Sequence, residues 1–264
     1  MRPLRISIPA RENSFHHHAA RRYFGEDAVM LHTGDMRSAI ARAEENLSDY
    51  TLLACSNTVA GHFYETYRLI YESKLHILDE VEWPVSLCLA AKPGVSLAEI
   101  RTAASHPYAL MQAEKTLLRK KITGRKNTAD TVEAARIVSR NSAGTLACVC
   151  AADVAERSGL QILLENVQEH RNNRTRFFIA GKGEGLHDHP DKLIVAADAE
   201  RLERPFHNAI SVHRVFPAKQ KDIPVFAELV REDGWKMIPG GLHVLGKICS
   251  AGKRTNHKPI HISL

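Results

Sequence analysis

An almost continuous apolar run at residues 50–55 (Tyr-Thr-Leu-Leu-Ala-Cys) constrains the fold of this chain more than any other feature. A strand is apolar along its whole length when both of its faces are buried, as in a parallel sheet covered by helices. Two strand patterns, at residues 4–9 and 28–32, precede it, and helical spacing of apolar residues separates the three, at 15–24 and 36–47. This βαβαβ order predicts an α/β fold with a mainly parallel sheet.

A second lobe is predicted after residue 84. Strand patterns at 85–91 and 146–150 alternate there with helical patterns, and residues 175–180 again resemble a strand, which returns the chain to the first lobe. We therefore expect lobe one to comprise residues 1–84 and 166–180, and lobe two residues 85–165. Two lobes joined by two crossings form a hinged cleft suited to a small ligand. Helices are expected in lobe two at 97–101, 109–119, 131–139 and 152–158.

The last third of the chain begins with a Gly-rich segment that ends at Pro190. Such a composition is typical of linkers, and we predict a linker region at residues 181–206. Beyond it the patterns indicate strands at 207–216, 242–249 and 259–264 and a helix at 223–231. Residues 207–264 are thus expected to form a small α+β unit.

The formal net charge of +6 does not indicate a nucleic-acid partner. The basic residues are scattered, and the densest run, Arg119-Lys120-Lys121, has no interleaved aromatic residues, which favours a solvated loop. An anionic small-molecule substrate accounts for part of the excess equally well. The longest apolar runs are shorter than the roughly 18 to 20 residues that cross a bilayer, and the first residues lack the apolar stretch of a signal peptide. We expect a cytoplasmic protein with no membrane partner.

Cysteine and histidine residues do not form a recognisable metal site. The five cysteines contain no CxxC pair, and Cys148 and Cys150 lie in a small apolar run typical of buried thiols. His16, His17 and His18 lie in a helical pattern, where adjacent side chains diverge by about 100° and cannot all bind one metal ion. The sequence also lacks a phosphate-binding loop and a dinucleotide fingerprint. We expect neither a metal nor a cofactor.

Four short runs carry the functional information. Residues 105–112 (Ser-His-Pro-Tyr-Ala-Leu-Met-Gln) resemble the Ser-His-Pro-Gln-Ala-Leu-x-Gln segment of prephenate dehydratases, and residues 131–135 resemble the Thr-x-x-Ala-Ala segment of that family. Residues 151–160 resemble a small-residue helix that ends in Gly-Leu, and residues 173–177 match the family signature Asn-x-Thr-Arg-Phe. Their order over about 75 residues identifies residues 1–180 as similar to the prephenate dehydratase catalytic domain.

Two further family segments match less well. The Pro-Ile-Glu-Asn-Ser stretch falls on residues 54–58, where Asn57 is retained and Thr58 preserves a hydroxyl, but Ser56 replaces the carboxylate. The Gly-Pro-x-Gly-Thr-Phe loop falls on residues 10–15, where only the hydroxyl of Ser14 and the phenylalanine remain. Both departures fall where the resemblance places the cleft.

The resemblance implies a fold, a reaction and a site. The fold is the two-lobed type of periplasmic binding proteins (type II), and the reaction converts prephenate to phenylpyruvate with loss of carbon dioxide and the ring hydroxyl. The protein then has to hold two carboxylates, assist departure of hydroxide and exclude water. Thr175 is inferred to assist the leaving hydroxyl, and Arg176 to pair with a substrate carboxylate. The other implied substrate-binding residues are Asn57, Thr58, Ser56, Ser105, Thr131, Ser14, Arg11 and Phe177.

Structural roles compete with several of these assignments. Thr175 is also an ordinary strand residue. In a strand Arg176 points to the opposite face, so we expect one of the two to contact the substrate and the other to brace the lobes. Ser105 and His106 precede a helix, where capping is the common role. Many members of the family end in a regulatory ACT domain with βαββαβ order, but the Gly-Ala-Leu and Glu-Ser-Arg-Pro motifs of its phenylalanine site are not found here. A degenerate ACT-like unit would serve pairing in a homodimer rather than feedback control.

The sequence therefore predicts a carbon–oxygen lyase that acts on prephenate or a close, small anionic analogue. One alternative is a repurposed relative in specialised metabolism, such as a prephenate decarboxylase or the dehydratase-like protein of tropodithietic acid biosynthesis. The Thr-Arg-Phe signature disfavours the decarboxylases, which tend to lose it. A second alternative is a ligand-binding protein that uses the two-lobed cleft without turnover.

Overall fold

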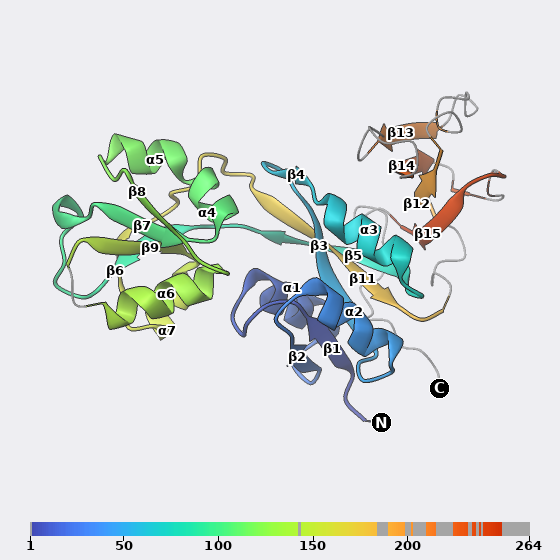
Figure 1. Cartoon of the computed structure of the whole chain (residues 1–264), viewed down its shortest axis with the longest axis horizontal. Coiled ribbons are helices and arrows are strands. Elements are labelled where there is room, and N and C mark those ends of the chain that lie inside the picture. Colours follow the sequence, from blue (N-terminus) through green and yellow to red (C-terminus); the bar gives the residue numbers. More distant parts are fainter. Residues whose placement is uncertain are drawn as a thin grey trace.

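Lobe one is built on strands that converge in the middle of the molecule (Figure 1). The computed structural model describes residues 2–141, 144–183, 190–198, 202, 210–214, 224–231, 234–235, 238 and 240–249. The strands of lobe one are β1 (Arg5–Ile8), β2 (Val29–His32), β3 (Tyr50–Asn57), β4 (Gly61–His62), β5 (His76–Pro84) and β11 (Arg174–Gly181). Its helices are α1 (Phe15–Phe24), α2 (Met36–Glu44) and α3 (Tyr64–Glu72).

The sheet of lobe one is mixed rather than mainly parallel. Its order is β2-β1-β3-β11-β5, with β1 parallel to β2 and β3, and with β11 antiparallel to both β3 and β5. The cause is the chain path. β5 runs out toward lobe two and β11 runs back from it, so the two strands must point in opposite directions.

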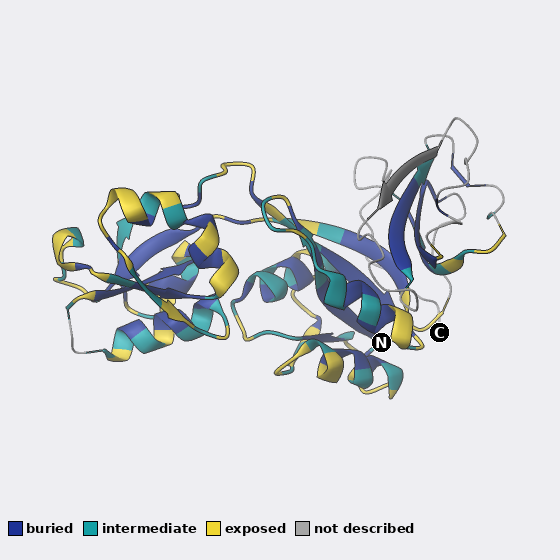
Figure 2. Ribbon diagram, turned by 45° about the horizontal axis from the view of Figure 1, so that its top comes forward, coloured by how far each residue is buried: buried dark blue, intermediate teal, exposed yellow. Residues whose placement is uncertain are grey.

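Side-chain alternation along β11 divides the core of lobe one into two layers. Phe177 and Ile179 pack under α1, whereas Phe178 and Ala180 pack under α2 and α3. The apolar run of β3 is buried between these layers, as its sequence predicts, and Leu52 and Leu53 have no exposed surface. Figure 2 shows the buried strands between partly exposed helices.

Lobe two contains a five-stranded sheet in the order β10-β6-β9-β7-β8. The predicted helix at 109–119 is interrupted at Ala113, so two short helices replace it. The predicted helix at 97–101 is a single 3₁₀ turn. Helices α4 and α5 cover one face of the sheet, and α6 and α7 cover the other. The elements are β6 (Cys88–Ala91), η1 (Leu97–Glu99), β7 (Thr102–Ser105), α4 (Pro107–Gln112), α5 (Glu114–Arg119), β8 (Gly124–Asn127), α6 (Thr131–Arg140), β9 (Leu146–Cys150), α7 (Ala152–Arg157) and β10 (Gln161–Leu164).

The described C-terminal residues form four antiparallel strands in the order β13-β14-β12-β15. They are β12 (Lys192–Ala197), β13 (Ile210–Arg214), β14 (Val225–Arg231) and β15 (His243–Ile248). A parallel contact between β15 and β5, at Gly246 and Ile77, joins them to the sheet of lobe one. Within the described residues, no helix has the length and apolarity needed to cross a membrane.

Two predictions fail in this part of the chain. The predicted helix at 223–231 is wrong, because this segment is β14, which pairs with strands on both sides. The spacing of its apolar residues is compatible with a helix as well as with a strand, so the sequence pattern did not decide between them. The predicted linker at 181–206 contains β12, whose six residues are all buried. Its pairing partners lie far along the chain and leave no local signal. The strand predicted at 259–264 lies outside the described residues.

We predict that Gly246→Ala loosens the junction between β15 and β5. A Cβ at this position would lie 2.5 Å from the carbonyl oxygen of Ile77 and 2.6 Å from its Cβ, so the two strands would have to separate. We expect the free energy of unfolding, measured by urea denaturation, to fall by about 1–3 kcal/mol. Gly34→Ala is the control, because a Cβ there meets no atom within 4 Å. Equal stability of both variants would contradict the prediction.

Candidate functional site

A cavity of about 810 Å³ lies between the two lobes. Lobe one contributes the first turns of α1 and α3 and the ends of β3 and β11, and lobe two contributes the first residues of α4 and α6. Much of the wall is apolar, as is usual for sites that bind small organic molecules. Its large side chains are Phe15, Met36, Phe63, Tyr64, Val85, Tyr108 and Phe177.

Strand β11 brings Thr175 and Phe177 to this cavity. The Thr175 hydroxyl oxygen accepts a hydrogen bond from Nδ2 of Asn57 at 3.0 Å. An amide nitrogen only donates, so the hydroxyl hydrogen of Thr175 remains available for a group in the cavity. The competing interpretation of Thr175 as a strand residue without access to the cleft is therefore not supported by its position.

Asn57 is held in one orientation by several hydrogen bonds. Its Oδ1 accepts from the backbone N–H groups of Val59 (2.9 Å) and Ala60 (3.1 Å), which identifies Nδ2 as the side facing β11. Nδ2 also donates to Oδ1 of Asn173 at 2.8 Å. From lobe two, Gln112 Nε2 donates to Asn57 Oδ1 at 3.1 Å. Asn57 thus connects the position of lobe two to the orientation of the Thr175 hydroxyl.

A bulge in β3 sets this pairing. Asn57 lies opposite Thr175 and Ser56 opposite Arg176, but Ala54 lies opposite Phe177, so β3 carries one extra residue at Cys55. Bulges of this kind bend a strand and redirect its side chains. The sequence pattern did not indicate the bulge, nor did it indicate Gln112 and Asn173 as members of the site. Their only signal was that both are polar residues of the recognised motifs.

Two more predicted residues line the cavity. The Ser14 hydroxyl is buried and accepts from the backbone N–H of His17 at 3.3 Å, which makes it the cap of α1. Thr131 is buried at the first turn of α6. Of the predicted residues, the cavity therefore brings together Thr175, Phe177, Asn57, Ser14 and Thr131.

The remaining predicted residues do not line this cavity. Ser105 is buried and donates to the carbonyl of Val149 at 2.6 Å, so it fastens β7 to β9 rather than binding in the cleft. Thr58 accepts from the backbone N–H of Arg174 at 3.0 Å. Arg11 lies at the rim between the lobes and forms ion pairs of 3.2 Å with Asp130 and of 3.2 Å with Glu133.

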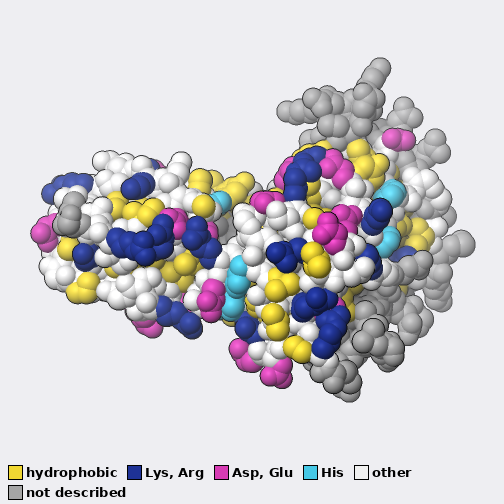
Figure 3. Space-filling model, turned by 60° about the horizontal axis from the view of Figure 1, so that its bottom comes forward, with side chains coloured by type: hydrophobic (Ala, Val, Ile, Leu, Met, Phe, Trp, Pro, Cys, Tyr) yellow, Lys and Arg dark blue, Asp and Glu magenta, His cyan; other side chains and the backbone are white. Residues whose placement is uncertain are grey.

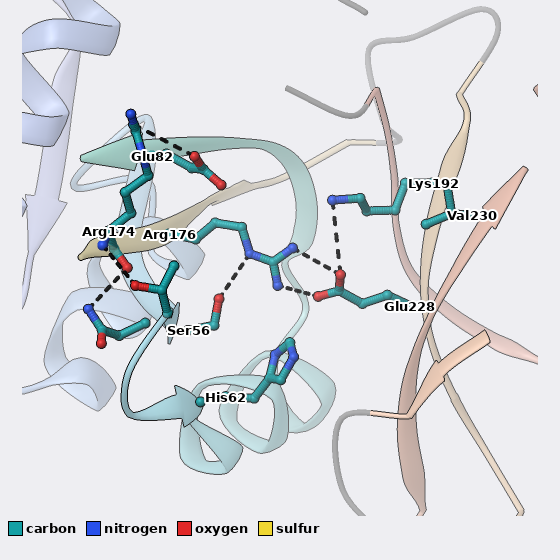
Figure 4. Close-up of a pocket in the computed structure, with 11 residues that line it drawn as sticks. Ser56, His62, Glu82, Arg174, Arg176, Lys192, Glu228 and Val230 are labelled. Carbon is teal, nitrogen blue, oxygen red and sulfur yellow. Dashed lines mark hydrogen bonds and ion pairs between the residues drawn. The ribbon is translucent and has the colours of Figure 1, made fainter. Parts of the chain in front are cut away.

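Arg176 lies on the opposite face of β11, against the C-terminal strands (Figure 4). Its guanidinium pairs with Glu80 at 3.1 Å and with both oxygens of Glu228. Lys192 completes the group through Glu80 at 2.7 Å. Strand alternation excludes Arg176 from the cavity, so the expected pairing with a substrate carboxylate there is not what the structure shows. Arg176 instead ties the C-terminal strands to lobe one.

The buried charges of this group balance, with two cations and two carboxylates. All four side chains are at most 12% exposed. A second pocket, of about 450 Å³, borders the group, and Ser56 lines it with its hydroxyl accepting from Arg176 Nε at 3.1 Å. We call Arg176, Glu80, Glu228 and Lys192 the junction cluster.

Comparison with known proteins assigns the chain to a family. Residues 8–184 match the family described as prephenate dehydratase, which is more than half of the chain. The chain belongs to the prephenate dehydratase family. Members of this family are carbon–oxygen lyases. The matched span contains every residue that positions Thr175.

Three similar proteins illustrate the relationship. A relative from Arabidopsis thaliana, arogenate dehydratase/prephenate dehydratase 1, is 36% identical over 145 residues, which are 55% of this chain and 37% of the relative. The structure of prephenate dehydratase from Arthrobacter aurescens in complex with L-Phe has a TM-score of 0.81 at 19% identity and covers 98% of this chain and 93% of its own. The structure of the quorum-quenching acylase GqqA has a TM-score of 0.73 at 23% identity, covering 95% and 100%.

These likenesses differ in what they show. The chain spans less than half the length of the curated relatives that it matches. The two solved structures share the fold, with alignments that cover nearly the whole chain.

Within the described residues, no group of three His, Cys, Asp or Glu side chains is placed to hold a metal ion.

We predict that Glu228 makes the stability of this fold sensitive to acid. Burial alone would raise its pKa, but the hydrogen bond and charge of Arg176, aided by Lys192 and Tyr67, outweigh burial and lower the pKa to about 2. A lowered pKa gives stability that is present above the ordinary value of 4.5 and is lost as the pH falls toward 2. The Glu228 contribution to the free energy of unfolding should fall by about 2 kcal/mol between pH 5 and pH 3.

Urea denaturation of Glu228→Gln tests this. The variant should be less stable than the parent at pH 7 by about 3 kcal/mol, because Arg176 loses a buried partner. Its stability should then change less between pH 5 and pH 3 than that of the parent. Glu156→Gln, at an exposed position, serves as the control. The same pH dependence in parent and Glu228→Gln would refute the assignment.

Proposed function

We propose that this chain catalyses the aromatising loss of carbon dioxide and hydroxide from prephenate or from its amino-acid counterpart, arogenate. The observation that carries the proposal is the Thr175 hydroxyl, which lines the cavity between the lobes with its oxygen held by Asn57 and its hydrogen available. The family membership supports the same class of reaction. The relative named for both dehydratase activities makes both compounds reasonable substrates to test.

The protein needs only to hold the substrate in position and to stabilise the departing oxygen. The electron pair of the bond to the departing carboxylate moves into the ring, carbon dioxide leaves, and the bond to the ring hydroxyl breaks. The departing hydroxide takes a proton from solvent and becomes water. Formation of the aromatic ring drives the change. A threonine hydroxyl has a pKa far above 7, so Thr175 stabilises the departing oxygen by a hydrogen bond rather than by full proton transfer.

The two lobes supply enclosure. Gln112 reaches Asn57 only when lobe two lies against lobe one, so closure and the orientation of Thr175 are linked through one amide. A ligand held between the two lobes is shielded from part of the solvent, and this shielding strengthens a hydrogen bond to the departing oxygen. The aromatic wall then packs against the ring as it becomes planar.

The position of Ser56 bears on whether the loss of the family glutamate argues against this reaction. Ser56, which replaces the family glutamate, faces the junction cluster and bonds with Arg176. The replacement therefore removes no carboxylate from the cavity between the lobes. It argues less against the reaction than its place in the sequence suggests.

A hydrolytic function like that named for GqqA has less support. Acyl transfer by serine or threonine requires a base hydrogen-bonded to the hydroxyl. The hydroxyls of Ser14 and Thr175 are instead bonded to a backbone N–H and to an asparagine amide, respectively. These contacts suit a hydroxyl that donates to a ligand.

The direct test is incubation of the full chain with prephenate and, separately, with arogenate at neutral pH, with phenylpyruvate and phenylalanine as the measured products. Acceleration over the spontaneous reaction of either compound is expected. No acceleration with either compound would refute the proposal. Decarboxylation without an aromatic product would favour a repurposed enzyme, and binding without turnover would favour a ligand-binding protein.

We predict that Thr175→Val lowers kcat at least about tenfold with little change in KM, because it removes a hydrogen bond worth at least about 1.4 kcal/mol in the transition state and keeps the side-chain shape. Thr175→Ser should keep most of the activity. Thr102→Val, in β7 and outside the cavity, is the matched control. Full activity of Thr175→Val would show that the hydroxyl plays no part.

A further inference from the structure

The cavity between the lobes has an unusual set of charges for a site that takes an acid. Among its described lining residues are three histidines and three carboxylates, and none is lysine or arginine. A carboxylate that enters an enclosed site needs a positive or hydrogen-bonding partner there. Figure 3 shows histidine side chains where the two lobes meet. The ionisable residues are His16, His62, His106, Asp35, Glu65 and Asp130.

His16 is the histidine without a hydrogen-bonding role. It is the second residue of α1, and its ring packs edge-on against Phe177 with centroids 4.9 Å apart. Within the described residues neither of its ring nitrogens takes part in a hydrogen bond. Burial, with a smaller effect of His106, lowers the pKa of His16 to about 4, so the ring is neutral near pH 7.

His106 faces the cavity from lobe two in a fixed state. Its Nδ1 accepts from the backbone N–H of Tyr108 at 3.3 Å and caps α4. An accepting Nδ1 requires the neutral ring with its hydrogen on Nε2. Protonation of His106 would cost this cap, so Nε2–H remains a donor while His16 is the ring free to gain a proton.

The three carboxylates of the wall are already engaged. Asp130 pairs with Arg11 and caps α6, Asp35 caps α2 through Ser38, and Glu65 pairs with Arg68 at 2.6 Å.

The neighbouring histidines on α1 are also engaged. His17 stacks on His32 with centroids 5.3 Å apart, and His18 Nε2 lies 2.9 Å from Asp153. His62 Nδ1 lies 3.0 Å from the hydroxyl of Tyr67. None of these groups offers His16 a counter-charge before a ligand enters.

We propose that His16 binds a carboxylate of the ligand as an imidazolium ion, taking one proton from solvent as the ligand enters, and that His106 Nε2–H donates to the same ligand from lobe two. The ligand class is an aromatic or cyclohexadienyl carboxylic acid. The inference rests on the proposed function only for that class. It adds a recognition residue in α1 and a proton that accompanies binding.

The sign of the pH effect follows directly. The free protein holds His16 neutral above about pH 4, and the bound carboxylate raises the pKa of the ring. Affinity therefore falls as the pH rises, by about tenfold per pH unit between the free and the bound pKa, because one proton is taken up per ligand. An uncharged ligand of the same shape shows no such dependence.

Isothermal titration calorimetry tests the inference without turnover. 3-Phenylpropionate and phenylpyruvate are titrated into the full chain at pH 6 and pH 7, in phosphate and in Bis-Tris buffer, whose ionisation enthalpies differ. We expect uptake of close to one proton at pH 6 and roughly fivefold tighter binding at pH 6 than at pH 7, because an ion pair with the bound carboxylate raises the pKa of the ring from about 4 toward about 7. 3-Phenylpropanol, which lacks the carboxylate, should bind with no proton uptake.

Two variants assign the proton. His16→Asn and His16→Gln should abolish both the uptake and the pH dependence, whereas His76→Asn, at an exposed position on β5, should preserve them. Retained binding of 3-phenylpropanol shows that a variant keeps its cavity. Should neither His16 variant fold, NMR of the ¹⁵N-histidine-labelled parent decides, since the number of imidazolium rings at pH 6 must rise by close to one when either acid is added.

Three results would overturn the inference. Proton uptake could persist in the folded His16 variants, or the parent could bind the acids without taking up a proton. The third is that neither acid binds between pH 5 and pH 7. The outcome is separable from that of the proposed function. Proton uptake through His16 without turnover of prephenate or arogenate would remove the function and keep the binding role, and turnover without uptake would do the reverse.

Discussion

The strict alternation of side chains along β11 is the constraint on which the rest of the structure depends. Adjacent residues of this strand serve two different boundaries, with Thr175 and Phe177 on the cavity between the lobes and Arg176 and Phe178 on the side of the C-terminal strands. β11 lies between β3 and β5 in the sheet, so neither residue can move without the other. The Thr-Arg pair thus places a hydroxyl on the cavity and a cation in the junction cluster.

The junction cluster shows how charge can be buried at modest cost. Removing four ionised groups from water is expensive, and their mutual attraction offsets that cost only when each keeps several partners. Arg176 bonds with two carboxylates and with Ser56, and Glu228 also accepts from the hydroxyl of Tyr67 at 2.9 Å. An arrangement of this kind fixes one docking geometry, because any displacement leaves a buried charge without a partner.

The sequence predicted those parts of the fold whose signal is local. The apolar run of β3 and the alternation of β11 both depend on near neighbours, and the structure agrees with each. Parts that depend on distant partners were missed or misplaced. Arg176 pairs with Glu228, which lies 52 residues further along the chain, and the sequence around either residue does not predict this ion pair.

The same reason explains which candidate residues were misplaced. Ser105 carries a family motif, but whether its hydroxyl meets a ligand or the carbonyl of Val149 depends on how β7 and β9 align. Strand β14 has apolar residues compatible with a helix, and only its two neighbouring strands decide otherwise. A resemblance transfers the identity of residues, whereas the direction of each side chain comes from the completed sheet.

The path of the chain through β5 and β11 has a consequence for how such proteins diversify. Pro84 and Arg174 are paired neighbours in the sheet, and the backbone N–H of Val85 bonds with the carbonyl of Asn173 at 2.8 Å. The chain therefore enters and leaves lobe two at the paired ends of β5 and β11. Lobe two is a long insertion at the end of this hairpin. Its length and sequence can change without altering the register of the two strands that hold Thr175. The wall that lobe two gives to the cavity is in this sense an exchangeable module, and the wall that carries the Thr175 hydroxyl is not.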